Sequence, residues 1–349
     1  MALATRYDGY LKDQTTNKPN NLTRNLVLVV VNLLSLACLV WTLRDAELGQ
    51  ILGDLSYVNW WWIALGSGAQ LSAYFIQSLR WRMILAPVAK LGFLQGVRAI
   101  LTGLFASEVL PLRAGEALRC YMVSKWTTLP FSVSASSVVI ERIFDGLVMW
   151  VGLRLVLQTG TLPRGFAYLS DSLGVVVLIG SALLAFALFG PKPSPPPFPL
   201  SGWRRRVAIL RADLVMIGHS PQLFMALLVT IPHIAVQAVP VRVLMRAYDF
   251  GLPWGAGVAL MLILRLAAAL PQAPASLGLY QLLTKEFLER GYHVAPAEAA
   301  RFSIVLWAIV KLPLLAAGAI SLGVTGANFG ELRAEAHSAA EASSRKDQA

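Results

Sequence analysis

Long apolar runs separated by short polar segments dominate the hydrophobic pattern of the chain. An uncharged run of about 20 residues is long enough to cross the hydrocarbon core of a bilayer as a helix. By this measure the pattern predicts about six full spans. They cover residues 25–43, 60–78, 131–156, 173–189, 223–245 and 302–324. The sequence therefore predicts an all-α, polytopic membrane helical bundle.

Two further apolar regions are interrupted near their middle. They cover residues 94–125 and 258–290. In the first, a short helix runs into Pro111 and a second short helix follows around Gly115; in the second, Pro271, Pro274 and Gly278 take the same places. Proline cannot continue a helix, and glycine permits a tight turn. Each half is too short to cross the membrane, so we expect two re-entrant broken-helix pairs.

The distribution of lysine and arginine predicts how the spans are oriented. The first 24 residues are basic, whereas the linker 44–59 is net negative. Because cytoplasmic loops carry the excess of positive charge, the N-terminus is expected in the cytoplasm. The first broken-helix pair then enters from the cytoplasmic side and the second from the external side, which makes an inverted repeat typical of transporters. The alternative is two unrelated proline kinks in ordinary spans.

The remaining polar segments divide the chain into parts. The expected parts are a cytoplasmic N-terminal segment (1–24), a transmembrane domain (25–325) with a Pro-rich loop (190–202) and an interfacial helix (203–218), and a disordered C-terminal tail (326–349). No signal peptide is recognisable, because the first apolar run is too long for one.

Composition agrees with this picture. Charged residues make up 14% of the chain, hydrophobic residues 56%, and the mean hydropathy is +0.60; soluble domains carry about 25% charged residues. The net charge of +11 indicates basic loops that face anionic lipid rather than a nucleic-acid surface. The two cysteines, Cys38 and Cys120, form neither a disulfide framework nor a zinc motif.

One predicted span carries a polar stripe. Ser134, Ser137, Glu141 and Asp145 share one helix face, and Arg142 lies within reach of Asp145. A charge at the bilayer centre costs at least ~2.5 kcal/mol, so these groups need partners or water. The stripe either lines a water-filled cavity or forms structural ion pairs that join helices. The two interpretations are compatible.

Charged residues also surround the first break. Glu108, Arg113, Glu116 and Arg119 lie near the start of a short helix, whose free N–H groups favour an anion. Arginine suits phosphate, so a lipid phosphate is the expected ligand. The alternative is that these side chains extend to the headgroup level without binding a specific ligand.

Two basic residues of the second half are candidate partners of the stripe. Arg265 and Lys311 are each expected to pair with its carboxylates, although Lys311 could instead reach the interface. His233 is expected to pack between helices. No nucleotide loop, metal-spaced His/Cys set or nucleophile elbow is present, so no catalytic residue, cofactor or metal is expected.

Four segments together resemble a known family. They are LRWRMIL at 79–85, EVLPLRAGEALRCYMVSK at 108–125, SVVIERIFDGLVMW at 137–150 and ALPQAPASLGLYQ at 269–281. They are similar to the lysylphosphatidylglycerol synthase transmembrane region, also called the flippase-like membrane family. The resemblance implies a lipid flippase or lipid-handling domain in which two re-entrant pairs meet in mid-membrane. Relatives are associated with aminoacyl-phosphatidylglycerol, hopanoids or polyprenyl-linked sugars.

The second motif departs from the family pattern. Ala275 and Ser276 stand where the family has glycines, and Gln281 stands where it has a glutamate. One carboxylate of the implied site is therefore missing. The synthase domain is not present in the sequence, so the chain is not expected to be a synthase itself.

These observations favour a transporter that binds an anionic lipid headgroup and moves it across the bacterial inner membrane, passively or coupled to an ion. The predicted binding and translocation residues are Glu108, Pro111, Arg113, Gly115, Glu116, Arg119, Glu141, Arg142, Asp145, Arg265, Pro271, Pro274, Gly278 and Lys311. One alternative is a membrane-embedded transferase that acts on a lipid-linked substrate with Glu141 or Asp145 as base. Another is an accessory subunit of a separate lipid synthase.

Overall fold

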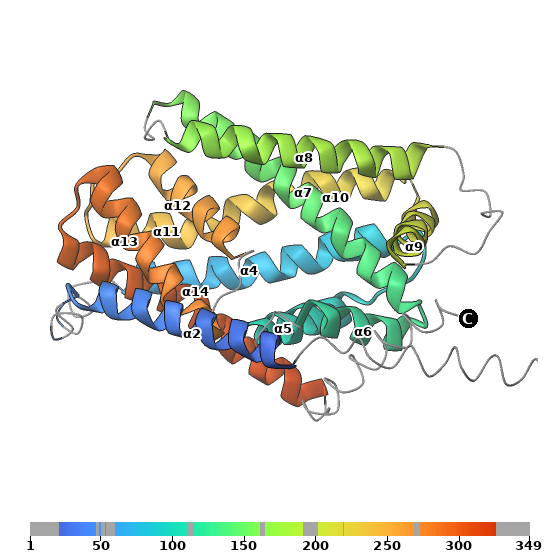
Figure 1. The fold of residues 1–349 in the computed structure, drawn as a ribbon, viewed down its shortest axis with the longest axis horizontal. Coiled ribbons are helices and arrows are strands. Elements are labelled where there is room, and N and C mark those ends of the chain that lie inside the picture. The colour runs from blue at the N-terminus through green and yellow to red at the C-terminus, as the bar shows by residue number, and fades with distance from the viewer. Residues whose placement is uncertain are drawn as a thin grey trace, which may run out of the picture.

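The computed structural model describes residues 21–46, 60–109, 115–160, 165–190, 202–218, 220–268 and 273–325, together with Gly49 and Gly53. Within these residues the regular structure is entirely helical, as the sequence predicts. The elements are α2 (Asn21–Leu43), α4 (Trp60–Leu85), α5 (Phe93–Val109), α6 (Gly115–Thr127), α7 (Phe131–Gln158), α8 (Gly165–Phe189), α9 (Gly202–Ile217), α10 (Pro221–Gln237), α11 (Val239–Ala247), α12 (Trp254–Ala267), the 3₁₀ turn η2 (Pro274–Ser276), α13 (Leu279–Tyr292) and α14 (Pro296–Thr325). Most of the helices run along the long axis of the molecule (Figure 1).

Three helical segments in the described part of the chain are long and apolar enough to cross a membrane, judged by length and composition. They are Gly165–Phe189, Pro221–Ala247 and Pro296–Thr325. Two shorter apolar helices, Asn32–Leu43 and Trp254–Ala267, accompany them. Helices α4 and α7 have 26 and 28 residues, and both carry charged side chains in their length. The total of six spans therefore stays a prediction.

Several element boundaries differ from the sequence prediction, since α8 begins at Gly165 instead of residue 173 and α14 begins at Pro296 instead of residue 302. The span predicted to end at residue 78 continues as α4 to Leu85, because Arg80 is buried against partners from other helices instead of marking an interface. The span predicted as 223–245 is divided into α10 and α11 at Ala238. Pro240 has no N–H to donate to the Val236 carbonyl one turn earlier, and Ala238 N–H bonds three residues back to Ala235 O at 3.1 Å, as in a tighter turn.

Both interrupted regions contain paired short helices with a break between them. The pair α5–α6 lies toward the end of the molecule that carries α9, and the pair α12–α13 lies toward the opposite end (Figure 1). A Cβ at Gly115 would lie 1.8 Å from the Gly103 carbonyl oxygen, so α5 and α6 cross at backbone contact. The two breaks themselves, around residues 110–114 and 269–272, lie outside the described residues.

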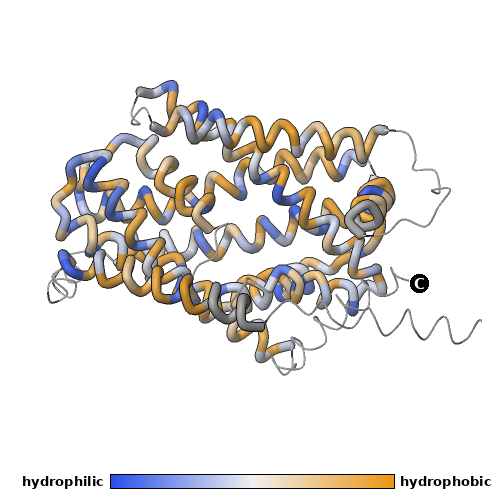
Figure 2. The backbone as a smooth tube through the Cα atoms, in the orientation of Figure 1, coloured by the Kyte–Doolittle hydropathy of each residue, from blue (hydrophilic) through white to orange (hydrophobic). Residues whose placement is uncertain are grey.

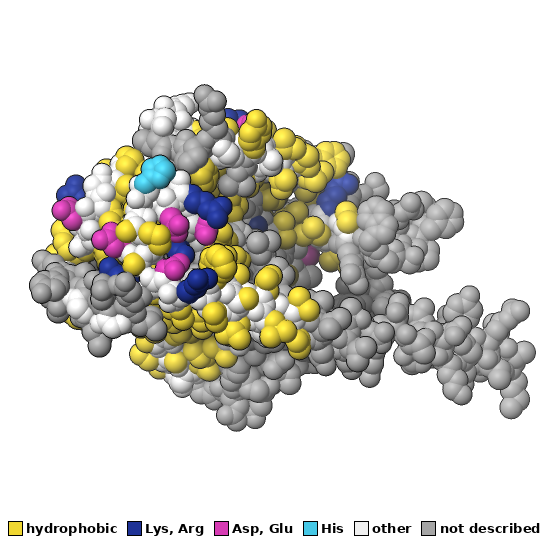
Figure 3. All heavy atoms as spheres, turned by 60° about the vertical axis from the view of Figure 1, so that its left-hand side comes forward, with side chains coloured by type: hydrophobic (Ala, Val, Ile, Leu, Met, Phe, Trp, Pro, Cys, Tyr) yellow, Lys and Arg dark blue, Asp and Glu magenta, His cyan; other side chains and the backbone are white. Residues whose placement is uncertain are grey.

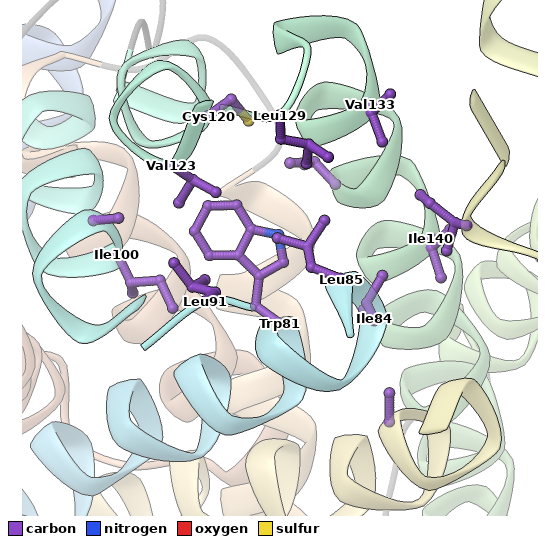
Figure 4. Close-up of a cluster of buried hydrophobic side chains, with 14 of the residues drawn as sticks. Trp81, Ile84, Leu85, Leu91, Ile100, Cys120, Val123, Leu129, Val133 and Ile140 are labelled. Atoms are coloured by element: carbon purple, nitrogen blue, oxygen red, sulfur yellow. The ribbon is translucent and has the colours of Figure 1, made fainter. Parts of the chain in front are cut away.

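A hydrophobic core surrounds Trp81 between the first broken pair and its neighbours. The indole lies among apolar side chains of α4, α5, α6 and α7 (Figure 4). Its Nε1 donates a hydrogen bond of 2.9 Å to Ser137 Oγ, so the one polar atom of the ring is satisfied. A second core gathers around Phe302 and Leu260, between α11, α12, α13 and α14. The functional candidates lie between these two cores.

The outer surface is apolar along the flanks and charged at the end toward α13. Helix α8 packs against α7 and α9 and exposes large apolar side chains such as Val176, Leu183 and Phe189. Charged side chains gather on the end of the molecule toward α13 (Figure 3), where Arg290 pairs with Glu286 at 2.6 Å. This distribution is what a helical membrane protein requires.

Helix α9 matches the predicted amphipathic helix 203–218 to within one residue at each end. Its Asp213 is buried and accepts a hydrogen bond of 3.0 Å from Ser136 on α7. A polar contact therefore fastens α9 to the bundle, while its position at a membrane interface stays a prediction.

Candidate functional site

The polar stripe of α7 is buried inside the bundle. Ser137 and Glu141 are 0% exposed and Asp145 is 4% exposed, and hydrophilic positions interrupt the hydrophobic middle of α7 in Figure 2. Buried carboxylates need compensating charges. The structure supplies these charges from three other helices.

Arg80 on α4 contacts both carboxylates. Its Nη2 donates to Glu141 Oε1 at 3.1 Å, and its Nη1 donates to Asp145 Oδ1 and also to Thr230 Oγ1. The side chain is 0% exposed. The span predicted to end at residue 78 therefore carries a buried arginine beyond its expected end.

Arg119 and Arg265 complete the charge arrangement from the two broken-helix pairs. Arg119 on α6 donates from Nη2 to Glu141 Oε2 at 2.7 Å, and its guanidinium lies 4.7 Å from the Trp81 ring centroid. Arg265 on α12 donates from Nη2 to Asp145 Oδ2 at 3.1 Å and from Nη1 to Gln237 Oε1. The expected pairing of Arg265 with the α7 stripe is confirmed. We call Arg80, Arg119, Arg265, Glu141 and Asp145 the arginine cluster.

A more accessible ion pair borders this cluster. Arg142 lies 3.5 Å from Glu116 and 3.7 Å from Asp145, and the Arg142 and Glu116 side chains are both 49% exposed. Arg142 is therefore within reach of Asp145, as its spacing predicts. The pair contributes one charge of each sign and leaves the balance of the cluster unchanged.

The arginine cluster has more positive than negative charge. Three guanidinium groups face two carboxylates, so one positive charge is left without a counter-charge among the described residues. Three of its donor atoms, Arg80 Nε and Arg119 Nε and Nη1, are buried without a hydrogen-bond partner in the same part of the chain. Uncompensated buried cations are costly, and an anion is the ligand that would compensate them.

A second charged cluster lies where the two broken pairs come together. Lys311 Nζ on α14 lies 2.5 Å from Glu108 Oε1 near the end of α5, and both groups contact Ser276 Oγ of η2, at 3.1 and 3.2 Å. We call these three residues the tip cluster. The expectation that Lys311 pairs with the α7 carboxylates was wrong, because α14 packs against α5 and so brings Lys311 to Glu108.

The other predicted residues of the second break have structural contacts. Pro274 opens η2, and Gly278 has a φ of +91° with so little room that a Cβ would lie 1.9 Å from Ser35 O on α2. Gln281 is buried and its Oε1 accepts a hydrogen bond of 2.8 Å from Gly278 N–H. In place of the carboxylate expected from the resemblance, Gln281 caps α13.

Some predicted site residues cannot be placed. Pro111, Arg113 and Pro271 lie outside the described residues. His233 is buried, and its Nδ1 lies 3.1 Å from Ala73 O, which fits the expected packing role between α10 and α4. No group of His, Cys, Asp and Glu with the geometry of a metal site occurs in the part of the chain that the structure describes.

Comparison with known proteins assigns the chain to a family. The family described as Lysylphosphatidylglycerol synthase TM region matches residues 26–318. The chain belongs to this family. The match covers the membrane helices and both clusters, so the resemblance deduced from the motifs is confirmed.

Two curated relatives each match part of the chain. The chain is 28% identical over 199 residues to a protein named Glycosyltransferase AglD from Haloferax volcanii, covering 48% of this chain and 31% of the relative. It is 27% identical over 127 residues to a UPF0104 membrane protein from Methanocaldococcus jannaschii, covering 36% of this chain and 37% of the relative. The matched part spans about a third of each relative's length. No solved structure matched the chain significantly.

Sequence reasoning missed three contributors, namely Arg80, Gln237 and Ser276. A signal for Arg80 was present, because Trp81, Met83, Ile84 and Leu85 continue the apolar pattern beyond it. An arginine followed by further apolar positions is typical of an intramembrane charge and not of a helix end. Ser276 had no comparable signal, since its importance depends on which helices meet at the break.

Proposed function

We propose that this protein binds an anionic lipid headgroup at the arginine cluster and translocates it across the membrane. The observation that carries the proposal is the unbalanced charge of that cluster: three buried or partly buried guanidiniums face two carboxylates. A phosphodiester headgroup carries one negative charge and would neutralise the excess. Its oxygens would also accept hydrogen bonds from the Arg119 donors that lack a partner among the described residues.

The arrangement of helices supports transport rather than static binding. Arg119 belongs to one broken-helix pair and Arg265 to the other, and both contact the same stripe on α7. In transporters, interrupted helices from two repeats commonly surround the substrate site near the bilayer midplane. We therefore propose that the two pairs are inverted repeats that open alternately to the two sides of the bacterial inner membrane. The N-terminus would lie on the cytoplasmic side.

A translocation assay tests this function. The full chain is reconstituted into phosphatidylcholine liposomes that contain fluorescent phosphatidylglycerol or fluorescent phosphatidylcholine, and a membrane-impermeant quencher reports the leaflet of the label. We expect faster movement of phosphatidylglycerol, and we expect Arg119→Gln to slow it. Arg154→Gln is the matched control, because Arg154 forms an exposed ion pair with Asp171 away from the cluster. Equal rates for both lipids, or full activity of Arg119→Gln, would contradict the proposal.

A second candidate is a membrane-embedded transferase, since one relative is named a glycosyltransferase. The geometry favours it less. Arg80 and Arg119 occupy both oxygens of Glu141, and Arg80 and Arg265 occupy both oxygens of Asp145. A carboxylate engaged in this way is a weak general base. Transfer of labelled sugar from a lipid-linked donor to a lipid acceptor, in the absence of translocation, would favour this candidate instead.

A further inference from the structure

The end of the molecule that carries α9 has a strong excess of positive charge. Three segments, 82–98, 120–132 and 202–218, contribute side chains to one hydrophobic core at this end. Together they contain eight basic residues and one acidic residue, Asp213, which is buried. The basic residues are Arg82, Lys90, Arg98, Lys125, Arg204, Arg205, Arg206 and Arg211. We call these eight residues the basic end.

The opposite end of the molecule is charged but balanced. Its segments 246–254 and 285–301 contain four basic and four acidic residues, and both signs are visible on that face in Figure 3. Arg290 pairs there with Glu286 at 2.6 Å. The excess of positive charge is therefore a property of one end and not of the whole surface.

Helix α9 lies across the bundle at the basic end. Figure 1 shows it almost end-on, whereas most of the other helices run along the long axis. One side of α9 buries Leu214 and Ile217, while its Val207 and Met216 are exposed. When the long axis of the bundle crosses the membrane, α9 lies along the bilayer surface, which is where amphipathic helices rich in lysine and arginine bind.

The charges of α9 are arranged unfavourably for a helix without a partner. Arg204, Arg205 and Arg206 fall within its first five residues, and its first turn contains no acidic residue. The N-terminal end of a helix dipole is positive, so cations there are unfavourable, and they also repel one another. A negatively charged surface beside α9 would remove both penalties.

Two other basic side chains of this end lie over exposed aromatic rings. The guanidinium of Arg82 lies 5.8 Å from the ring centroid of Phe93, and that of Arg211 on α9 lies 5.0 Å from the ring centroid of Phe186 on α8. Long basic side chains that cover apolar surface with their stems are typical of a bilayer interface. The basic end therefore combines the two chemistries of a lipid interface, apolar surface and positive charge.

We infer that the basic end binds anionic phospholipid headgroups of the leaflet that it faces, as a surface separate from the arginine cluster. The positive charges at 204–206 attract headgroup phosphates, while Val207 and Met216 contact the apolar boundary. Because Asp213 on α9 accepts a hydrogen bond of 3.0 Å from Ser136 on α7, this attachment also holds the first turns of α7. The inference does not rest on the proposed function, since headgroups bound at this surface are not the ones transported.

Hydrogen–deuterium exchange of α9 tests the attachment. The full chain is placed in nanodiscs of phosphatidylcholine or of phosphatidylglycerol, and mass spectrometry follows the exchange of the backbone amides of α9. We expect exchange at least roughly fivefold slower in phosphatidylglycerol, which is the factor that one basic residue beside an anionic membrane contributes. The amides of α13, at the balanced end, are the internal reference and should exchange equally in both lipids.

Salt separates electrostatic attachment from other effects of the lipid. Raising the sodium chloride concentration from about 0.1 M to about 1 M shortens the Debye length from about 10 Å to about 3 Å, so the slowing of α9 should largely disappear. Equal exchange of α9 in the two lipids at the lower concentration would overturn the inference. Slowing that survives at the higher concentration, or that affects α13 to the same extent, would overturn it as well.

Variants assign the effect to the arginines of α9. Arg204→Gln, Arg205→Gln and Arg206→Gln combined should remove most of the difference between the lipids, whereas lysine at the same three positions keeps the charge and should preserve the difference. Arg290→Gln is the matched control, because Arg290 is 80% exposed at the opposite end. An undiminished difference in the glutamine variant would overturn the assignment, and if this variant does not fold, the salt dependence of the unaltered protein decides.

Discussion

Arg119 on α6 donates a hydrogen bond of 2.7 Å from Nη2 to Oε2 of Glu141 on α7, and both side chains are buried. The contact connects the first broken-helix pair to the helix that carries the polar stripe. It leaves Arg119 Nη1 and Nε without a hydrogen-bond partner among the described residues. Arg119 therefore has a structural role toward Glu141 and also donor atoms available to a ligand.

Replacing Arg119 should weaken binding of an anionic headgroup more than binding of a neutral one. Hydrogen bonds to charged groups contribute about 1.5–3 kcal/mol, so Arg119→Gln is expected to reduce affinity for phosphatidylglycerol at least tenfold. Arg119→Lys keeps the charge but loses the forked geometry and should fall in between. Native mass spectrometry with phosphatidylglycerol and phosphatidylcholine measures the difference. An equal loss for both lipids would indicate a general structural defect.

Removing Arg80 should destabilise the protein more than removing any exposed charge. Arg80→Gln leaves Asp145 with Arg265 alone on its buried side and Glu141 with Arg119 alone. Breaking one partner of a buried ion pair costs about 3–5 kcal/mol. Unfolding by sodium dodecyl sulfate in mixed micelles measures the change in free energy, with Arg154→Gln as the control. A change in Arg80→Gln no larger than in the control would contradict the assigned network.

The close crossing of α5 and α6 can be tested separately from charge. Gly115→Ala would place a Cβ 1.8 Å from Gly103 O, so the helices must separate and move Arg119 relative to Glu141. We expect lower stability and slower headgroup translocation. Gly152→Ala on α7 is the matched control, because a Cβ there meets nothing within 4 Å. Normal translocation by Gly115→Ala would show that this backbone contact does not position the site.

An ion pair at the end of α2 predicts a pH dependence of stability. The hydrogen bond from Lys285 Nζ to Asp45 Oδ2, 2.6 Å long, holds the pKa of Asp45 below its usual value of 3.8. The stabilisation is present above the unfolded pKa and disappears as the pH falls through the lower folded value. Asp45→Asn should therefore lower the unfolding temperature at pH 7, and this effect should disappear as the pH falls through the lowered pKa of Asp45 in the folded protein. Because Asp45 is 40% exposed, the effect at pH 7 should be less than about 1 kcal/mol.

The sequence predicted most of the architecture because hydrophobic patterns determine which residues enter a membrane. It located both interrupted regions from their Leu-Pro and glycine motifs, although proline alone does not end a helix here, since Pro232 lies inside α10 and Pro313 inside α14. It also predicted that Glu141 and Asp145 need partners or water, because a charge inside an apolar run is costly, but it left open whether the stripe lines a cavity or forms ion pairs.

Partners far apart in the sequence could not be assigned in the same way. Arg80 lies 61 positions before Glu141, and Lys311 lies 203 positions after Glu108. Pairing at such separations depends on how the helices pack. The charge pattern predicted that Lys311 pairs with the stripe on α7 or reaches the interface, and it could not identify Glu108 as the partner. Gln281 is a further example, because its capping bond to Gly278 depends on the local turn geometry of η2.

We propose that the uncompensated charge of the arginine cluster holds a lipid phosphate. The most direct measurement is a cryo-electron microscopy structure of the full chain in nanodiscs of phosphatidylglycerol. We predict density for a headgroup phosphate within hydrogen-bond distance of Arg119 Nη1 or Nε, and its absence in nanodiscs of phosphatidylcholine treated in the same way. If another side chain of the protein closes the cluster, and no phosphate lies beside Arg119 in phosphatidylglycerol nanodiscs, the proposed headgroup site is wrong.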